Sequence, residues 1–489
     1  MIRLTEVDGI PAVVARTGGP THAGLVFRVG IADEPLARRG ITHLVEHLVL
    51  GRPSAGHHRN GATGVEHTYF HTQGTADEIT AFLEGVCAVL RDPPADRIAE
   101  AAEALHAESA GRGRDRLPMW RYGARDFGMA SYPEWGLDRI TGEDLHDWIG
   151  RFFTRENAAL WVAGDGPAES LRLDLRSGVR QAPPAPSAAP PGAPAWFAGD
   201  SDMVGWDTVV RREARAAVFA NVLERQMFRD LRLRGGISDQ VRTEYEPRAA
   251  GSARITAYAD SLPGRREAVL GGMVDVLAGM RAGRIDDEDV ATVVGLTCDG
   301  LKHAESRGGR LPGQAFNLLA GRGVQGIGEV LAEVRAVTAA DVAEVAADAY
   351  REGLLMTPEG TAADWAGYAA APVSSGPVVS GRAYRGRKDR ALRLIHGDEG
   401  VSVITGDATA TVRYDTCAAL LAWPDGGRHL VGEDAIVAKV EPTLFRGAEE
   451  VVRDLDQRFP GALRVVMPAR DPSAVPAPVA GRPWWRRET

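Results

Sequence analysis

Hydrophobic and polar residues alternate along the chain with periods that predict both helices and strands. The first eight residues alternate apolar and polar side chains, as in a half-buried strand. A strand-like segment also spans residues 254–260. Apolar residues recur at helical spacing in four stretches: 214–234, 265–281, 286–307 and 338–350. We therefore expect an α+β protein.

The pattern changes beyond about residue 382, where short strand-like runs replace the long helical stretches. Gly and Asp separate several of these runs, as hairpin turns require. A helical stretch follows, with Val451, Val452, Leu455 and Phe459 on one face. The runs are 391–396, 401–405, 409–414, 417–423 and 435–440. This pattern predicts a small β-barrel-like unit that ends in an amphipathic helix.

Two segments of biased composition divide the chain into units. Residues 181–195 are rich in Pro and Ala, which disfavour a regular helix or a central strand, so we interpret them as a linker. A second linker, rich in Gly, Pro and Ser toward its end, is expected at 361–381. The expected domains are 1–180, 196–360 and 382–470, followed by a disordered tail at 471–489.

Composition narrows the function classes. The chain has 489 residues, of which 44% are hydrophobic and 25% charged, as in soluble globular proteins. It has no apolar run long enough for a membrane span and no signal-peptide pattern at its start, so a cytoplasmic location is expected. Three cysteines give no disulfide framework, and a net charge of −9 argues against nucleic acid as the main partner.

A metal-binding pattern lies within residues 40–50. His43 and His47 are four residues apart, so both imidazoles leave one face of a helix and can bind one divalent ion. Glu46 borders that face and can accept a proton from a water bound to the ion. Zinc with three protein ligands keeps a position open for water and lowers its pKa to about 7. His-x-x-Glu-His is the inverted zinc motif, and it predicts hydrolysis of a peptide bond.

The third metal ligand is expected on the helical stretch 96–109. This stretch carries three acidic candidates, Glu100, Glu103 and Glu108, and its residues alone do not select among them. Further histidines at 57, 58, 67 and 71 have a spacing that fits no standard metal site. We interpret these four as polar loop or strand residues.

These segments resemble the pitrilysin–insulinase family of zinc metallopeptidases, known as M16, and its short bacterial branch in particular. Gly40–Leu50 matches the family's Gly-Ile-x-His-x-x-Glu-His segment. The likeness covers roughly residues 1–355. Four other segments carry it: Asn60–Thr68, Leu105–Glu108, Ile140–Gly164 and Leu231–Asp239.

The resemblance implies two related domains, each a curved mixed sheet covered by helices, which form half of a clamshell chamber. It selects Glu108 as the third ligand of Zn²⁺, beside His43 and His47, with Glu46 as the catalytic base. It also implies that a peptide substrate pairs with an edge strand. The implied substrate-binding residues are Asn60, Ala62 and Thr63 on that strand and Arg232 in the second domain.

Three departures from the family pattern stand out. The spacer between His47 and Glu108 is shorter than usual, mainly before Asn60, which removes a helix beside the cleft and is expected to widen it. Ala101 replaces an acidic residue that normally supports the ligand Glu. Asp239 replaces the tyrosine that helps to hold substrate, and we expect it to pair with Arg232 and neutralise it.

The resemblance also suggests a partner. In the family's heterodimers one subunit carries the zinc motif and the other an Arg/Tyr pair, so this chain is expected to be the zinc-bearing subunit, with a homodimer as the alternative. The expected activity is zinc-dependent cleavage of short unfolded peptides, such as maturation of a small precursor or removal of its leader. A non-catalytic structural or assembly subunit is the competing hypothesis.

The third unit is similar to a pleckstrin-homology-like domain. The segments Gly400–Val403, Thr411–Tyr414 and Trp423–Val431 carry this likeness. Such a unit can bind a peptide or a partner, or brace the enzyme. Basic residues between 382 and 393 supply a weak lipid-binding patch, although a solvated linker explains them better.

Overall fold

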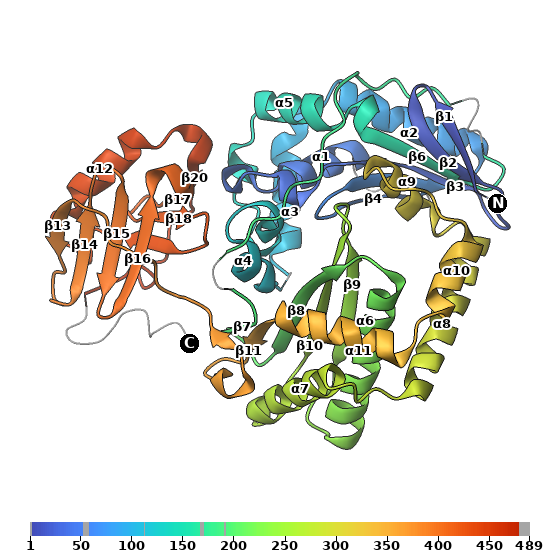
Figure 1. Ribbon diagram of the computed structural model, residues 1–489. Helices are drawn as coiled ribbons and strands as arrows, with labels where there is room; N and C mark the ends of the chain where they lie inside the picture. Colours follow the sequence, from blue (N-terminus) through green and yellow to red (C-terminus); the bar gives the residue numbers. More distant parts are fainter. Residues whose placement is uncertain (1, 52–57, 112, 167–170, 190–191, 479–489) are drawn as a thin grey trace.

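The computed structural model describes residues 2–51, 58–111, 113–166, 171–189 and 192–478. Figure 1 shows two large units, each a sheet with helices, and a third, smaller unit beside them. Among the described helices, none is both long and apolar enough to cross a membrane. The mixture of helices and sheets confirms the predicted α+β class.

The first unit is built on a six-stranded mixed sheet. Its strand order is β1-β2-β6-β3-β5-β4, in which β2 and β6 are parallel and the other pairs antiparallel. This order leaves β4 at an edge of the sheet. The strands are β1 (Arg3–Val7), β2 (Ile10–Ala15), β3 (His22–Phe27), β4 (His58–Thr63), β5 (Thr68–Gln73) and β6 (Ala158–Ala163).

Helices cover one face of this sheet. Leu44, Val45 and Leu48 of α1 share a buried core with Leu25 of β3 and Phe70 of β5. The helix α1 spans Ile41–Leu50. Three further helices contribute to the core or lie against α1: α2 (Ala76–Arg91), α3 (Ile98–Ser109) and α5 (Gly142–Phe152). The apolar stripe of α1 therefore faces the sheet and leaves its polar stripe for the candidate site.

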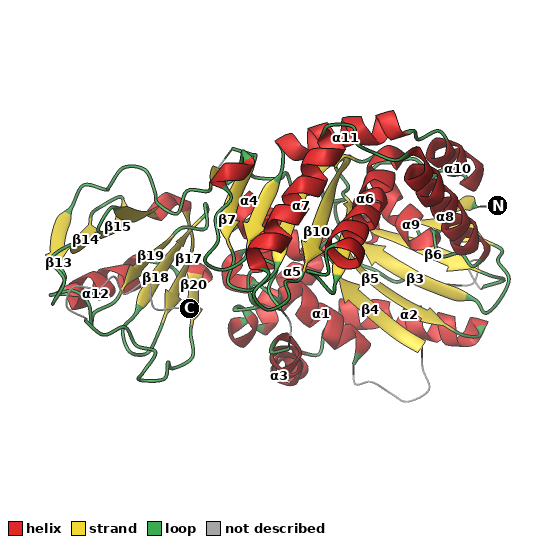
Figure 2. Ribbon diagram, turned by 90° about the horizontal axis from the view of Figure 1, so that it is seen from below, coloured by secondary structure: helices red, strands yellow, loops and turns green. Residues whose placement is uncertain are grey.

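The second unit repeats this architecture with a sheet of order β12-β7-β11-β8-β10-β9. Figure 2 shows α6 (Ala214–Met227) and α7 (Arg266–Arg281) over this sheet, and α11 (Ala339–Arg351) packs against both. A π-helical turn, Phe228–Arg234, extends α6 to the end of the predicted stretch 214–234. The strands are β7 (Ala195–Ala198), β8 (Val204–Arg211), β9 (Val241–Pro247), β10 (Ser252–Ala259), β11 (Leu354–Thr357) and β12 (Ala369–Ala370).

The chain of the second unit returns to cover the free face of the first sheet. After α8 (Asp287–Ser306), the helix α9 (Leu311–Leu319) lies on the face opposite α1, where Phe316 packs with Val26 and Trp161. The helix α10 (Ile327–Arg335) then leads back to the second unit. The two units are therefore joined by an apolar contact as well as by the chain.

The Pro/Ala-rich segment carries no helix or strand in its described residues 181–189 and 192–194. It is nevertheless held to the first unit, because the Ser187 hydroxyl donates to the Tyr122 carbonyl at 2.6 Å. At the other end of the chain, residues 479–489 of the expected disordered tail lie outside the described residues. The Pro476 carbonyl in the described part accepts a hydrogen bond from Thr443.

The third unit differs from the predicted barrel. Its strands form two separate four-stranded sheets, β13-β14-β15-β16 and β19-β18-β17-β20, so the expected barrel-like closure is wrong for the described residues. The sheets share a buried core that includes Leu394 and Leu430, and α12 (Ala448–Arg458) adds Val451 and Leu455 to it. Side-chain packing and a helix, rather than a continuous strand ladder, therefore complete the unit.

The five predicted runs of the third unit correspond to β14, β15, β16, β17 and β19, whereas β13, β18 and β20 were not predicted. The predicted amphipathic helix is α12, in which Val451 and Leu455 are fully buried. The likeness to pleckstrin-homology domains stays a prediction. The strands are β13 (Arg382–Arg385), β14 (Leu392–His396), β15 (Gly400–Thr405), β16 (Ala408–Arg413), β17 (Cys417–Ala422), β18 (Arg428–Gly432), β19 (Val437–Val440) and β20 (Arg464–Val466).

Candidate metal centre

The helix α1 begins at a defined point because a buried carboxylate binds its first amides. Glu34 accepts hydrogen bonds from the backbone amides of Gly40, at 2.9 Å, and Thr42, at 2.8 Å. Gly40 has φ 106°, a conformation that favours glycine and turns the chain into the helix. Glu34 thus satisfies amides that a helix N-terminus leaves without partners, and fixes the position of His43.

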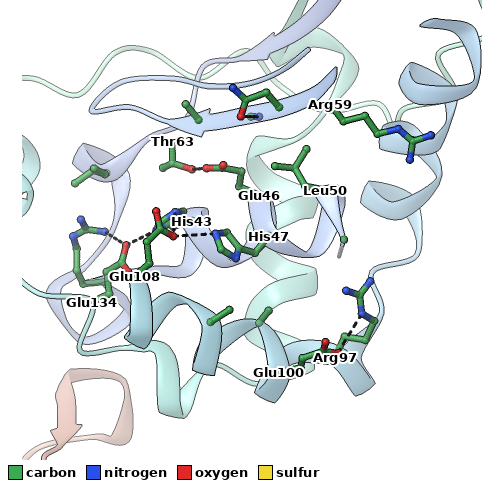
Figure 3. Close-up of a pocket in the computed structure, with 18 residues that line it drawn as sticks. His43, Glu46, His47, Leu50, Arg59, Thr63, Arg97, Glu100, Glu108 and Glu134 are labelled. Atoms are coloured by element: carbon green, nitrogen blue, oxygen red, sulfur yellow. Dashed lines mark hydrogen bonds and ion pairs between the residues drawn. The ribbon is translucent and has the colours of Figure 1, made fainter. Parts of the chain in front are cut away.

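The two histidines of α1 and one acid of α3 meet at a point (Figure 3). Oε2 of Glu108 lies 3.4 Å from Nε2 of His47 and 3.9 Å from Nε2 of His43. All three ligand atoms lie within 4.8 Å of one another. Tetrahedral ligands about 2.1 Å from a zinc ion are about 3.4 Å apart, so small side-chain movements would suffice to bind one. Glu108 therefore stands where the resemblance implies a third ligand.

Glu134 holds the other side of His43, a role that sequence reasoning missed. Its Oε1 lies 2.8 Å from Nδ1 of His43 and 3.6 Å from Nη1 of Arg39. A hydrogen bond at Nδ1 fixes the ring orientation and leaves Nε2 facing Glu108. Ala101, where the family has an acid, is buried in the core instead. The supporting carboxylate thus comes from a turn 91 positions after His43.

Glu46 lies beside the ligands and is held by the edge strand. Thr63 Oγ1 donates a hydrogen bond of 2.8 Å to Oε2 of Glu46, whose side chain is buried. Gly61 of the same strand leaves room for this side chain, since an added Cβ would lie 3.1 Å from Cγ of Glu46. The carboxylate is therefore fixed next to the ligand atoms without belonging to the cluster that they form.

Burial and neighbouring charges shift the histidine pKa values in opposite directions. Burial disfavours the charged form of His43, but the hydrogen bond and the charge of Glu134 outweigh it and raise its pKa. Burial, reinforced by His43, lowers the pKa of His47. Neutral imidazole is the form that binds a metal, and the lowered pKa favours this form of His47.

The cluster opens into a cavity of about 720 Å³. Residues of the edge strand β4 line the same cavity, including the predicted substrate-binding residues Asn60, Ala62 and Thr63. Glu100 also lines it but lies outside the ligand cluster, and Glu103 is exposed. Residues 52–57, half of the segment between His47 and Asn60, fall outside the described residues, and with them the expected widening of the cleft.

Solved structures with the same architecture include a protease from Helicobacter pylori, which matches at 14% identity and a TM-score of 0.60 over 73% of this chain and 99% of that one. A peptidase M16 inactive domain from Pseudomonas fluorescens matches at 13% identity and 0.58, over 76% and 99%. The first half of the periplasmic protease PqqL from Escherichia coli matches at 10% and 0.56, over 76% and 94%. The chain has the M16 peptidase fold.

No family model and no curated protein sequence matches the chain. The identities to the solved structures are low, so the likeness establishes the fold alone. Proteases and an inactive domain share this M16 fold. The activity must therefore be argued from the residues of the candidate centre.

The second unit does not bring Arg232 to the candidate metal centre. Arg232 is exposed on the π-helical turn after α6, where its guanidinium lies 5.2 Å from the ring centroid of Phe228. It does not line the cavity around His43. The expected ion pair with Asp239 is wrong, since the described residues show none between them. The backbone amide of Asp239 instead donates to Asp260, which holds that turn away from Arg232.

The interpretation of the other histidines as polar loop or strand residues stays a prediction. In the part of the chain that the structure describes, His43, His47 and Glu108 form the only group spaced to hold a metal ion. His58 is exposed at the start of β4, and His57 lies outside the described residues. His67 and His71 lie with Tyr69 on the face of the first sheet opposite α1.

Proposed function

We propose that the chain is a zinc-dependent endopeptidase of the M16 family that hydrolyses short unfolded peptides. The observation that carries this proposal is the convergence of His43, His47 and Glu108, with Glu46 fixed beside them at an edge strand. Two imidazoles and one carboxylate are a donor set that zinc prefers. Three protein ligands are also the number found in catalytic rather than structural zinc sites.

The residues fit the chemistry that such an ion provides. A bound zinc ion would supply a Lewis acid and a water molecule with a pKa near 7. Glu46 accepts a proton from the attacking water and returns it to the leaving amine. The hydrogen bond from Thr63 keeps Oε2 of Glu46 directed toward β4, where the peptide would lie. His43 is kept in the correct orientation by Glu134.

The substrate class follows from the edge strand. Among the described strands, β4 has a neighbour on one side only, so an extended peptide can add to its other side through backbone hydrogen bonds. Such backbone pairing depends on the extended conformation of the peptide more than on its sequence, so the peptide must be unfolded. Maturation of a small precursor or removal of its leader, at a cytoplasmic location, is the use that we propose for this activity.

Replacement of the base tests the proposal. Glu46→Gln keeps the size of the side chain and its contact with Thr63 but cannot accept a proton, so we expect kcat on an unstructured peptide to fall at least about 100-fold. Zinc content, measured by elemental analysis, should not change. Glu103→Gln, on the exposed side of α3, is the matched control and should keep full activity.

Equal activity of Glu46→Gln and the unchanged protein would overturn the proposal. Absence of activity in both, with zinc bound, would favour the alternative of a non-catalytic assembly subunit, which the inactive P. fluorescens domain with this fold makes a specific candidate. The complete His-x-x-Glu-His set on α1 favours the enzyme.

We also propose that a second M16-like subunit with an Arg/Tyr pair completes the site. Support comes from Arg232, which is exposed away from the cavity, and from Asp239 in place of tyrosine. Homodimerisation is the alternative. Purification of the tagged chain from its native source, followed by mass measurement of the intact assembly, separates the two: a heterodimer contains a second chain, whereas a homodimer does not.

A further inference from the structure

A second cavity lies on the face of the first sheet opposite the metal helix. It has a volume of about 450 Å³. Strands β3, β5 and β6 form its floor, and α9 and the end of β9 from the second unit form its walls. We call it the aromatic pocket and define it by Glu66, His67, Tyr69, Trp161, Glu246 and Phe316.

Rings dominate the lining of the aromatic pocket. The ring centroids of His67 and Phe316 lie 4.5 Å apart, and those of Tyr69 and Trp161 lie 6.3 Å apart. Gly24 makes room for the indole, because a Cβ there would fall 2.4 Å from it. Burial lowers the pKa of His67 to about 4, so this ring is uncharged at neutral pH. The faces of such rings attract cations.

The lining includes a buried carboxylate, Glu66, in which one of the two oxygens has no hydrogen-bond partner among the described residues. Glu66 is 4% exposed. Its Oε2 accepts a hydrogen bond from the Ala249 amide at 3.0 Å. Its Oε1 is buried and has no hydrogen-bond partner among the described residues. An ionised oxygen buried in this way is costly unless a donor reaches it.

Carboxylate and guanidinium groups lie together around the pocket. Burial raises the pKa of Glu66, and the charge of Glu246 adds to this rise, whereas the Ala249 amide and Arg248 oppose it. Arg212 is the cation in the lining, and its guanidinium is bound to Asn317 Oδ1 at 2.8 Å and to the Arg248 carbonyl at 3.2 Å. Glu246 is paired with Arg248, whose Nη2 lies 3.4 Å from its Oε2, so Oε1 of Glu66 is the carboxylate oxygen of this group without a partner among the described residues.

The turn that follows β4, the strand to which we assign the substrate, contributes Val65, Glu66 and His67 to the lining of the aromatic pocket. Glu66 follows Thr63 of β4 by three residues, a span of at most about 10 Å. Successive side chains of a strand added to β4 would point alternately to the metal face and to the face that carries the pocket. A long side chain on the second face, or the end of the peptide, can extend toward Glu66.

We propose that the aromatic pocket binds a positively charged amino or guanidino group of the peptide on β4. The stem of the bound group lies against the rings, and its N–H groups donate to Oε1 of Glu66. The pocket therefore makes the protein selective for peptides that carry a basic side chain or a free terminal amine at a fixed distance from the cleaved bond. This inference rests on the proposed peptidase function, because it places the peptide on β4.

Binding of short labelled peptides tests the inference independently of cleavage. The full-length chain with Glu46→Gln and bound zinc is titrated with an acetylated peptide that contains one lysine, and Kd is measured by fluorescence anisotropy. A second peptide has norleucine in place of lysine, which keeps the stem and removes the charge. A third has norleucine and a free N-terminus, which distinguishes a terminal amine from a side chain as the bound group.

We expect the Kd of one charged peptide to be about tenfold lower than that of the acetylated norleucine peptide. Adding Glu66→Gln should abolish this preference while keeping an acceptor for the Ala249 amide. Glu244→Gln, at an exposed position of the same strand as Glu246, is the control and should preserve it. An unchanged preference in the Glu66→Gln protein, or no preference before that change, would overturn the inference.

A second variant covers the case in which Glu66→Gln fails to fold. Tyr69→Leu removes a ring at a half-buried position and should reduce the preference about threefold, and an unaltered preference would count against the pocket. The two proposals fail separately. Charge-selective binding without cleavage by the unchanged protein would refute only the peptidase, whereas cleavage of charged and uncharged peptides with equal kcat/KM and Kd would refute only the pocket.

Discussion

At the scale of single residues, the candidate centre combines a local motif with a distant carboxylate. Glu134 reaches Nδ1 of His43 across 91 positions, while Ala101 occupies the position where the family resemblance implies a supporting acid. We expect Glu134→Ala to weaken zinc binding about tenfold or more, because the imidazole loses the partner that orients it. Competition with a chelating dye measures this change. Glu103→Ala should bind zinc as the unchanged protein does, and equal affinity in both variants would contradict the role of Glu134.

The sequence predicts the residues that share one helix turn better than those that meet through folding. His43, Glu46 and His47 follow from helical spacing alone. Glu108 needed the family resemblance, since Glu100 and Glu103 lie on the same helix. Nothing near Glu134 in the sequence identifies its partner, because that contact depends on how a turn packs against α1. The absence of an Arg232–Asp239 pair has the same origin: Asp260 holds the turn of Asp239.

At the scale of elements, the third unit packs directly on the segments that carry the site. Ala419 and Leu421 of β17 share a buried cluster with Leu36, in the short turn before α1, and with Met129. The Met129 carbonyl accepts a hydrogen bond from Arg39, which also lies 3.6 Å from Glu134. Contacts therefore run from β17 through Met129, Arg39 and Glu134 to His43. We infer that the third unit braces the candidate centre.

Truncation of this interface should affect both stability and the site. Leu421→Ala is expected to cost about 2–5 kcal/mol of unfolding free energy and to weaken zinc binding, because the turn that positions Glu134 loosens. Leu394→Ala, in the core that the two sheets of the third unit share, is the matched control. It should cost a similar amount in urea unfolding and leave zinc affinity unchanged. Equal zinc affinity in both variants would show that the third unit does not brace the centre.

The elements themselves were largely predictable, whereas their pairing was not. The strand-like runs 401–405 and 409–414 correspond to β15 and β16, because a period of two residues is a local property. Whether strands close into a barrel depends on which edge strands pair with each other. The alternation of apolar and polar residues along a strand does not determine this pairing. The two open sheets of the third unit are the result.

At the scale of the whole molecule, a buried ion cluster joins the first two units. Asp207 of β8 is fully buried between Arg254 of β10 and Arg121 of α4 (Leu117–Tyr122), a helix of the first unit. Nε of Arg254 lies 2.9 Å from Oδ2 of Asp207. Burial opposes ionisation of Asp207, but the two guanidinium groups outweigh it and hold its pKa below the ordinary value of 3.8.

Asp207→Asn should therefore destabilise the protein by about 3–5 kcal/mol at pH 7, since two buried guanidinium groups lose their counter-charge. A carboxyl whose folded-state pKa is depressed contributes stability above its unfolded pKa and loses it as the pH falls through the folded value. The difference between the two proteins in urea unfolding should accordingly narrow in strong acid. A difference that stays constant with pH would contradict this account of the interface.

The central claim is that His43, His47 and Glu108 bind one zinc ion, and anomalous diffraction from zinc-grown crystals tests it most directly. Data collected on either side of the zinc absorption edge should give a single strong peak about 2.0–2.2 Å from Nε2 of both histidines and from a carboxylate oxygen of Glu108. No peak at this position, or a peak bound by other residues while Glu108 points away, would contradict the account.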